Sequence, residues 1–426
     1  MHLKIHYIDT EQNLIQLKDS LLTCDIVIDA IFGIGYRNEM ADLISKVIGL
    51  VNNTKNEIKD KKTYSIISID VPSGVDATTG LVGGAAVEAD ITVAFEYPKM
   101  GLLKYPASNY AGKITIANIG IPRPNPIEKE HFTSKVEHAR PRHSTDLEVT
   151  DSKLVANIIP RRKVDYHKGN CGRVLIIAGS SGMMGAAVLA ANSALRTGSG
   201  LVNLCVPRDI KNHVNSMSLE VVVSDLGSIN NLTSKSDAIA IGPGLSMNRS
   251  TAKLVADLLV SGIVRVPIVI DADGLNSISD PQILKRSAKD IVITPHPGEF
   301  ARLTRCTVTD IEKDRMGHAR RFAEEYGITV LLKGAYTVIA GKGKKLFINP
   351  VGNPAMATAG VGDVLCGIIT SLIGQGVNSF DAAVAGAYIH GMAGNIASSI
   401  KGEHGLIASD IIENIPFAIK SILQFA

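Results

Sequence analysis

The sequence predicts an α/β protein with two domains, each built on a parallel sheet. Apolar runs of strand length alternate with segments of helical periodicity along most of the 426 residues. These runs are almost continuously apolar, which is typical of strands that are covered on both faces of a sheet. Hydrophobic residues make up 45% and charged residues 20% of the chain, so a disordered protein is excluded.

A charged, proline-containing stretch with weak periodicity divides the chain. We expect a first domain at residues 1–125, a linker at 126–159 and a second domain at 160–426. The first domain has a predicted helix at 40–53 and predicted strands at 24–33, 64–74, 89–99 and 111–120. The second has predicted helices at 184–198 and 359–376, and predicted strands at 172–179, 200–207, 236–244, 266–274, 290–298, 328–334 and 336–341.

Composition excludes several classes of partner and compartment. The net charge is only +3, Trp is absent and aromatic residues make up 4%, so a nucleic-acid partner is not expected. No apolar stretch approaches the roughly 18 residues of a membrane span, so a membrane partner is not expected either. The five cysteines are scattered, odd in number and without a CxxC pair, which favours reduced thiols and a cytoplasmic protein.

The strongest motif is NPAMATAGVGDVLCGIITSLIGQG at residues 353–376. Gly360 and Gly362 form a flexible turn, and Asp363 stands at the start of an apolar helix. Amide groups at a helix N-terminus bind anions, and glycines let a phosphate approach. Asp363 is therefore a candidate general base facing a phosphate site, although an Asp at this place can also be a simple helix cap.

A second motif is VLLKGAYTVIAG at residues 330–341, in which a strand runs into Lys333–Thr337 and a further strand follows. Lys and Thr beside free amides suit a nucleotide phosphate. The alternative is a plain hairpin turn with a solvated lysine.

A third motif is VITPHPGEFARL at residues 292–303, where two prolines and a glycine fix a turn after a strand. His296 and Glu299 project from this turn, and His296 is a candidate substrate contact. No second cluster of ligands has matching spacing, so a metal site is not favoured. The alternative to a substrate contact is a purely structural turn.

Two strand ends, IGPGLS and VIDADGLN, place Gly242, Gly244, Asp271 and Asp273 near one edge of the predicted sheet. The two acids share a face and can polarise water or hold magnesium indirectly, or they can simply form turns. The Gly/Ser turn at 179–182 fits neither a P-loop nor a GxGxxG fingerprint.

The first domain carries the motifs VIDAIFGIGYRNEM at 27–40 and SIDVPSGVDATTG at 68–80. Asp29 and Asp70 each end an apolar strand, and Gly33 and Gly35 build a loop fit for a phosphate. Two carboxylates at neighbouring strand ends can serve as acid, base or cation ligands, or as turn formers.

The motifs of the second domain, together with GEHGLIASDIIENIP near the C-terminus, resemble the NAD(P)H-hydrate dehydratases of the ribokinase-like superfamily. The resemblance implies a three-layer α/β/α fold and dehydration of the S epimer of hydrated NADH or NADPH, with ADP rather than ATP, and Mg²⁺. It implies that Asp363 acts at the substrate, beside the substrate-binding Ala186, Gly244 and His296. It also assigns the nucleotide to Lys333, Gly334, Ala335, Tyr336, Thr337 and Gly362.

The motifs of the first domain resemble the Rossmann-like NAD(P)H-hydrate epimerase domain. This resemblance implies Asp29 and Ser73 as potassium ligands and Asp70 as the catalytic acid or base. It assigns hydrate binding to Gly33, Ile34, Gly35, Tyr36, Arg37, Asn38, Glu39 and Asp70. The family's domain starts well before the position of Met1 and contains an Asn-Asn-Gly-Gly-Asp-Gly phosphate loop that this sequence lacks. We therefore expect a partial domain with impaired epimerase activity and an exposed sheet edge. A homo-oligomer contact or another partner chain is expected to cover this edge, and the alternative is that the chain is a fragment of a longer gene product.

Two other functions are compatible with parts of this pattern. One is a kinase of the same superfamily that phosphorylates a vitamin or sugar alcohol, since the Gly–Asp helix start serves both reactions. The other is a non-catalytic nucleotide-binding scaffold. The motifs KGAYT and TPHPGE and the fused epimerase-like segment favour cofactor repair over the kinase, and the intact Asp363 argues against the scaffold.

Overall fold

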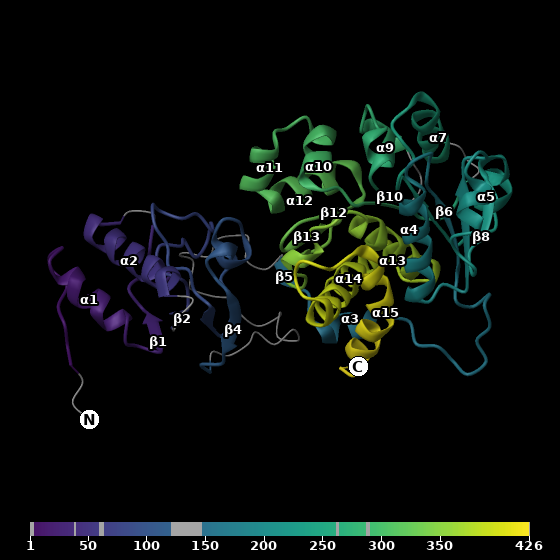
Figure 1. The fold of residues 1–426 in the computed structure, drawn as a ribbon. Coiled ribbons are helices and arrows are strands. Elements are labelled where there is room, and N and C mark those ends of the chain that lie inside the picture. The colour runs from purple at the N-terminus through teal and green to yellow at the C-terminus, as the bar shows by residue number, and fades with distance from the viewer. Residues whose placement is uncertain are drawn as a thin grey trace, which may run out of the picture. The chain divides into compact units, whose positions relative to one another are not determined.

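The computed structural model describes residues 4–37, 40–58, 64–120, 147–260, 264–286 and 290–425. The chain forms two compact units, Met1–Arg140 and Pro141–Ala426 (Figure 1). Each unit has its own sheet, and the strands of both sheets are mostly parallel. The predicted α/β class is therefore confirmed.

The first unit is built on a four-stranded parallel sheet with the order β1-β2-β3-β4. Its strands are β1 (Ile26–Asp29), β2 (Ser65–Ile69), β3 (Ile91–Phe95) and β4 (Lys113–Ala117). Its helices are α1 (Asn13–Leu21) and α2 (Asp42–Ile58), with short 3₁₀ turns η1 (Met100–Leu103) and η2 (Ala107–Asn109). Ile48 and Val51 of α2 pack with Ile66 of β2 in a small core on one face of the sheet.

The other face of this sheet is apolar but poorly covered. Ile28, Ile67 and Ile91 are neighbours in register across β1, β2 and β3, so their side chains share one face. Ile26 and Ile28 are 55% and 66% exposed, and Ile67 and Ile91 are only half-buried. Parallel sheets normally have both faces covered. Among the described residues of the first unit, only one face has a buried core of this kind.

The second unit contains a ten-stranded sheet with the order β5-β14-β13-β12-β11-β10-β9-β6-β7-β8. The pairs β12–β13 and β13–β14 are antiparallel and all other pairs are parallel. Its strands are β5 (Leu147–Val149), β6 (Arg173–Ile177), β7 (Leu201–Val206), β8 (Val222–Asp225), β9 (Ala238–Ile241), β10 (Ile268–Ile270), β11 (Ile291–Ile293), β12 (Thr329–Leu332), β13 (Thr337–Ala340) and β14 (Leu346–Asn349).

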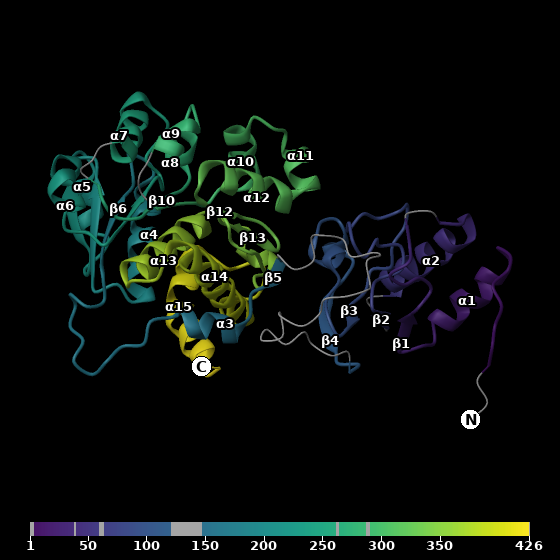
Figure 2. The same ribbon diagram turned by 180° about the vertical axis from the view of Figure 1, so that it is seen from behind.

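Helices cover both faces of this sheet, which gives three layers. In Figures 1 and 2, helices α7, α9, α10 and α12 lie on one side of the strands, and α13, α14 and α15 lie on the other. The helices of the unit are α3 (Ser152–Ile158), α4 (Met184–Thr197), α5 (Lys211–Asn215), α6 (Ile229–Thr233), α7 (Arg249–Val260), α8 (Asp273–Asn276), α9 (Gln282–Arg286), α10 (Pro297–Thr304), α11 (Val308–Lys313), α12 (Arg315–Tyr326), α13 (Val361–Gly374), α14 (Ser379–Lys401) and α15 (Ala408–Leu423), with 3₁₀ turns η3 (Leu226–Ser228) and η4 (Pro354–Met356).

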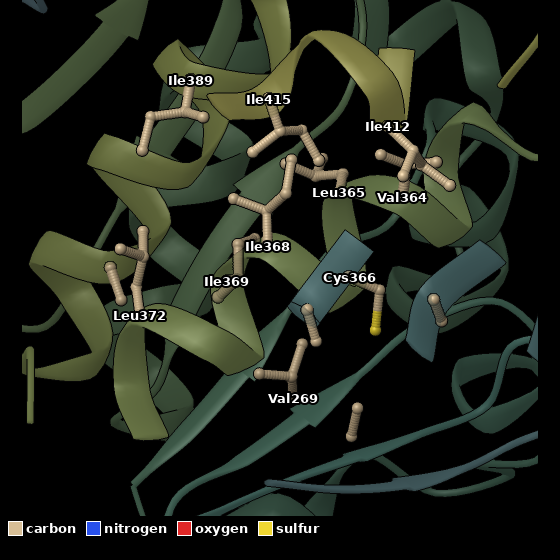
Figure 3. Close-up of a cluster of buried hydrophobic side chains, with 14 of the residues drawn as sticks. Val269, Val364, Leu365, Cys366, Ile368, Ile369, Leu372, Ile389, Ile412 and Ile415 are labelled. Atoms are coloured by element: carbon tan, nitrogen blue, oxygen red, sulfur yellow. The ribbon is translucent and has the colours of Figure 1, made fainter. Parts of the chain in front are cut away.

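Helix α13 is the centre of the larger core. It is buried without interruption from Val364 to Gly374, because its sequence is apolar or small all the way round. Figure 3 shows Ile368 and Ile369 of α13 among side chains from the neighbouring helices, with Val269 of β10 close by. A helix held on all sides cannot shift easily. The residues of its first turn therefore have fixed positions.

Three strands, and every helix other than α2, α4 and α13, had no predicted residue range. Strand β8 (VVSD) is half polar and partly exposed, and β14 (LFIN) directly follows the lysine-rich segment 342–345, so neither stands out as a long apolar run. Strand β5 and helix α3 lie within the stretch predicted as linker, where the helix starts because the Asp151 side chain accepts a hydrogen bond from the Leu154 amide. The rest of that predicted linker, residues 126–146, lies outside the described residues.

A helix that crosses a membrane must be both long and apolar, and the described helices of this chain can be judged by that requirement. Within the described ranges, none of them is both long and apolar enough to cross a bilayer.

Candidate active site

A cavity of about 950 Å³ opens in the second unit at the carboxyl ends of β10, β11 and β12. Parallel sheets place ligands at this edge, outside the ends of the strands. Three loops that follow these strands contribute Asp271, His296 and Lys333, and the first turn of α13 contributes Asp363. The remaining lining residues are Ala272, Pro297, Gly334–Thr337, Asn349–Pro354, Met356–Gly362, Leu365, Ala387, His390 and Gly391.

Lys333 is a buried cation held between two buried carboxylates. Its Nζ atom lies 2.7 Å from Oδ1 of Asp271 and 3.9 Å from Oε2 of Glu299. The Lys333 side chain is 19% exposed, and those of Asp271 and Glu299 are 1% and 6% exposed. Burial disfavours the charged lysine, but the two carboxylates overcome this and raise its pKa above the usual value. The solvated lysine that we considered as an alternative is therefore wrong.

Asp363 has the electrostatic character of a base that works near neutral pH. It is the third residue of α13, and it is partly buried at the edge of the cavity. Burial raises its pKa to about 7, and the negative charge of Asp271 adds to this, while Lys333 opposes it. A carboxylate with such a pKa exchanges its proton readily at physiological pH.

The start of α13 is open toward the cavity and has no side-chain cap. Its N-cap residue, Gly360, has a φ of +86° and, as a glycine, has no side chain that could accept a hydrogen bond from the first turn. The first amides of α13 thus have no side-chain acceptor from this residue, and the helix dipole favours negative charge there. A Cβ atom at Gly362 would lie 3.3 Å from the Lys333 Nζ atom. This turn and the lysine therefore meet at one place that suits a phosphate.

The loop of the KGAYT motif joins β12 to β13 as a hairpin. Residues 333–336 connect the strands, which pair through Leu332 and Val338. Gly334 has a φ of +145° and Tyr336 a φ of +55°, so two positions of this short loop are left-handed. The Thr337 hydroxyl donates to the Gly334 carbonyl at 3.0 Å. The hairpin and the candidate nucleotide loop are thus the same structure.

His296 lines the cavity and also caps a helix. Its Nδ1 atom accepts hydrogen bonds from the amides of Gly298 at 3.0 Å and Glu299 at 3.4 Å, at the start of α10. The Glu299 carboxylate in turn accepts the His296 amide at 2.8 Å, which completes a capping box. Since Nδ1 is an acceptor, the Nε2 atom is the one that carries the proton. The Nε2 atom lies 3.5 Å from Oε1 of the same Glu299 carboxylate, and its N–H is the one donor that His296 can offer to a ligand.

Two predicted substrate residues, Ala186 and Gly244, lie together but do not line this cavity. A Cβ atom at Gly244 would lie 3.0 Å from the Ala186 Cβ atom and 2.8 Å from the Met183 carbonyl oxygen. They sit by the ends of β6 and β9, and β9 is next to β10 in the sheet. The structure therefore places them near the Asp271 end of the site.

Gly242 fixes the backbone that carries Asp271. Its φ is +134°, and a Cβ atom there would lie 1.8 Å from the Asp271 carbonyl oxygen. We expect Gly242→Ala to lower the free energy of unfolding by about 3 kcal/mol, since both the left-handed backbone and the overlap are costly. Gly182→Ala is the matched control, with a φ of +85° but nothing within 4 Å of the new Cβ atom. Equal denaturant midpoints for both variants would contradict this role of Gly242.

His390 is a cavity residue that sequence reasoning missed. Its Nε2 atom lies 3.0 Å from the carbonyl oxygen of Val361, the first residue of α13. Burial lowers its pKa to about 4, so it is neutral and donates to that carbonyl. A single histidine within the apolar pattern of α14 gave no signal of this contact.

In the first unit, the predicted potassium ligands Asp29 and Ser73 do come together. The Ser73 hydroxyl donates to Oδ1 of Asp29 at 2.5 Å and accepts the Phe32 amide at 2.8 Å. Oδ2 of Asp29 accepts from the Ser68 hydroxyl and the Ser73 amide. These oxygens satisfy one another, so the described residues do not fit an open potassium site, and no step is assigned to that ion.

Asp70 has a strained backbone and a fixed side chain. Its φ is +68°, and its carboxylate forms an ion pair with Lys99 and accepts the Phe95 amide at 2.9 Å. A non-glycine residue in this conformation is held there by its surroundings.

The predicted hydrate loop of the first unit is only partly described. Gly33, Ile34, Gly35 and Arg37 are exposed, whereas Tyr36 is buried and donates to the Gly83 carbonyl at 3.1 Å. Tyr36 is therefore a packing residue in this structure. The predicted residues Asn38 and Glu39 lie outside the described residues.

Comparison with known proteins covers both units. A family model described as NAD(P)H-hydrate dehydratase matches residues 174–417, and one described as YjeF-related protein N-terminus matches residues 1–101. The bifunctional NAD(P)H-hydrate repair enzyme Nnr of Moorella thermoacetica is 38% identical over 97% of this chain and 76% of its own length.

Solved structures resemble the second unit. An ADP/ATP-dependent NAD(P)H-hydrate dehydratase from Bacillus subtilis, co-crystallized with ATP and Mg²⁺, has a TM-score of 0.58 and 29% identity and covers 64% of this chain and 97% of that one. A ribokinase-like superfamily protein from Enterococcus faecalis has a TM-score of 0.58 at 24% identity, over 66% of this chain and 98% of that one. The predicted ribokinase-like fold is thereby confirmed.

Proposed function

The chain belongs to the family of bifunctional NAD(P)H-hydrate repair enzymes, and we propose that its second unit dehydrates the S epimer of hydrated NADH and NADPH with consumption of ADP. The observation that carries this proposal is the position of Asp363. Its carboxyl group, with a pKa of about 7, stands at the uncapped start of α13, in one cavity with Lys333 and the loop that follows it. A base and an anion site that share a cavity suit a hydroxyl that must react with a phosphate.

The hydrated cofactor has a hydroxyl group on its reduced nicotinamide ring, and hydroxide is a poor leaving group. In our proposal the Asp363 carboxylate accepts the proton of this hydroxyl. The hydroxyl oxygen of the hydrate then attacks the terminal phosphoryl group of ADP, and AMP is released. The carbon–oxygen bond then breaks with phosphate as the leaving group. The adjacent ring carbon loses a proton to solvent, which restores the ring double bond. One hydrate and one ADP thus give one reduced cofactor, one AMP and one phosphate.

The nucleotide would lie along Lys333, Gly334, Ala335, Tyr336 and Thr337, with its phosphates at Gly362 and the first amides of α13. The charge of Lys333 and the helix dipole both favour phosphate there. Tyr336 is partly buried, and burial raises the pKa of its hydroxyl, so it stays neutral beside the nucleotide. His296 would donate from Nε2 to the substrate, and Ala186 and Gly244 would contact the part of the substrate that extends past Asp271.

Magnesium requires oxygen ligands, and it usually comes to such sites bound to nucleotide phosphates. Among the described residues, no group of three or more His, Cys, Asp or Glu side chains can hold a metal ion by itself. The mechanism therefore assigns no step to a magnesium ion bound by the protein alone.

A direct assay tests the proposed reaction. The purified chain is given S-hydrated NADH, with ADP in one reaction and ATP in another, and recovery of the absorbance band of reduced cofactor is followed. We expect recovery with ADP, in proportion to AMP formed, and slower recovery with ATP. Absence of recovery with both nucleotides would contradict a dehydratase, and phosphorylation of an unrelated alcohol would favour a kinase.

The raised pKa of Asp363 predicts a specific pH dependence. Because the base must be deprotonated to accept the hydroxyl proton, kcat/KM should rise tenfold per pH unit below pH 7 and level off above it. A kcat/KM profile measured from about pH 5 to 9 gives this apparent pKa. A profile that is flat through pH 7, or that falls as the pH rises there, would contradict the assignment.

We propose that the first unit epimerises the hydrate only weakly. Two observations support this: the oxygens of Asp29 and Ser73 satisfy each other, and the Asp70 carboxylate is paired with Lys99. Pure R-hydrated NADH with excess ADP is the test. Recovery of cofactor faster than the spontaneous interconversion of the epimers would show an active epimerase.

A further inference from the structure

The side chain of Arg315 lies directly under the KGAYT loop. This residue starts α12 and its side chain is only 12% exposed. Its Nη2 atom donates to the carbonyl oxygens of Leu332 at 3.1 Å and Lys333 at 2.9 Å. Its Nη1 atom donates to the Glu312 carboxylate, 3.1 Å from Oε1. The guanidinium group thus connects Glu312, near the C-terminus of α11, to the backbone at the C-terminal end of β12.

The loop has a shape that needs such support. Gly334 and Tyr336 have positive φ values, and Tyr336 has a side chain that makes this conformation unfavourable. A Cβ atom at Gly334 would lie 2.6 Å and 2.7 Å from the two terminal nitrogens of Arg315. The guanidinium is therefore packed against the Gly334 backbone, and no larger residue fits between them.

The same contacts hold the peptide groups on both sides of Lys333. Its amide donates to the Pro295 carbonyl at 2.8 Å, its carbonyl accepts from Arg315, and its Nζ atom is paired with Asp271. The last two contacts come from charged side chains that are mostly buried. Lys333 is thus fixed in backbone and side chain before any nucleotide arrives.

We propose that Arg315, held in place by Glu312, is a positioning residue that presets the nucleotide loop Lys333–Thr337. This rests on the nucleotide site described under the proposed function. Arginine suits the task because its planar fork reaches two carbonyls and a carboxylate at once, which the single ammonium group of a lysine cannot do with the same geometry. Glu312 balances the buried charge, so the guanidinium directs the loop without an unpaired cation.

The test uses Arg315→Met, Arg315→Lys and the control Arg321→Lys. Arg321 is on the same helix, is 63% exposed and pairs with Asp314 at 3.3 Å, away from the loop. We expect Arg315→Met to raise the calorimetric Kd and the KM for ADP by about tenfold or more, with the KM for the hydrate within about twofold. Arg315→Lys should recover part of the affinity, and Arg321→Lys should match the wild type.

A second measurement is independent of nucleotide binding. Amide hydrogen exchange of residues 334–336 should be faster in Arg315→Met than in Arg321→Lys, while exchange in α13 should be unchanged. A wild type that binds no nucleotide would contradict the proposed function, but the exchange comparison would still decide the role of Arg315. Wild-type Kd and wild-type exchange in a folded Arg315→Met protein would overturn the inference. So would an equal loss of affinity for both substrates, which indicates a merely structural role.

Discussion

Asp363→Asn is expected to lower the dehydratase kcat by about a thousandfold while the Kd for ADP stays within about twofold of the wild type. The substitution keeps the size and polarity of the side chain and removes only its ability to accept a proton. The nucleotide contacts assigned to Lys333–Thr337 and Gly362 are untouched. Single-turnover kinetics with S-hydrated NADH, together with calorimetric titration of ADP, measure the two quantities separately.

The matched control is Asp381→Asn. Asp381 is the third residue of α14, as Asp363 is the third residue of α13, and both lie in the first turn of a helix. Asp381 is bonded to the helix cap Asn378 and does not line the cavity. Its variant should keep wild-type kcat. A similar loss of kcat in both variants would mean that a helix-capping effect, not base catalysis, explains Asp363.

The Asp363→Asn variant should also be more stable than the wild type at alkaline pH. The pKa of Asp363 is raised in the folded state, so folding favours its protonated form. Its contribution to stability is therefore fully present below about pH 4, the pKa of Asp363 in the unfolded chain, and is lost as the pH rises through 7, its pKa in the folded protein. The size of this contribution is about 1.4 kcal/mol for each pH unit between these two pKa values. Asn carries no charge to desolvate. Denaturant unfolding at pH 8 should thus give a higher midpoint for Asp363→Asn, and a lower one would contradict the buried, raised-pKa carboxylate.

Lys333→Met is expected to lower the free energy of unfolding by about 3 kcal/mol and to weaken ADP binding by about a hundredfold or more. Without the ammonium group, the carboxylates of Asp271 and Glu299 remain buried with no cation between them, which is the costly way to break a buried ion pair. The lost affinity comes from a charge that would contact the phosphates. Urea unfolding and calorimetric titration at pH 7 measure the two effects.

Lys345→Met provides the comparison for an exposed pair. Lys345 pairs with Glu148, and their side chains are 52% and 40% exposed. Loss of such a pair typically changes stability by less than about 1 kcal/mol. If the two lysine variants unfold at the same urea concentration, Lys333 cannot be the centre of a buried charge cluster.

Much of the fold was predictable because its strands are short, apolar and followed by glycine-rich loops. The predicted strands at 172–179, 236–244 and 328–334 contain β6, β9 and β12. What failed were elements whose stability comes from their neighbours. The edge strand β8 has partly exposed side chains and depends on its pairing with β7. Strand β5 is three residues long and pairs with β14, which is distant in sequence.

The site was predictable as separate motifs but not as an arrangement. Each motif follows a strand, which placed it at the correct edge of the sheet. The contact between Lys333 and Asp271, however, joins residues 62 positions apart, and it depends on the strand order β12-β11-β10. His390 and Arg315 had no local signal at all, since each is a single residue in a helix whose role comes from a loop elsewhere.

The exposed isoleucines of the first sheet have a consequence for the life of the protein in a cell. Ile26 and Ile28 lie on β1, an edge strand, and their face of the sheet carries further half-buried apolar side chains. Molecular chaperones bind exposed apolar surface, and an unpaired strand edge beside such a surface promotes aggregation. We therefore expect that covering this face, by another segment or by a second copy, protects the first unit from chaperone binding and from aggregation.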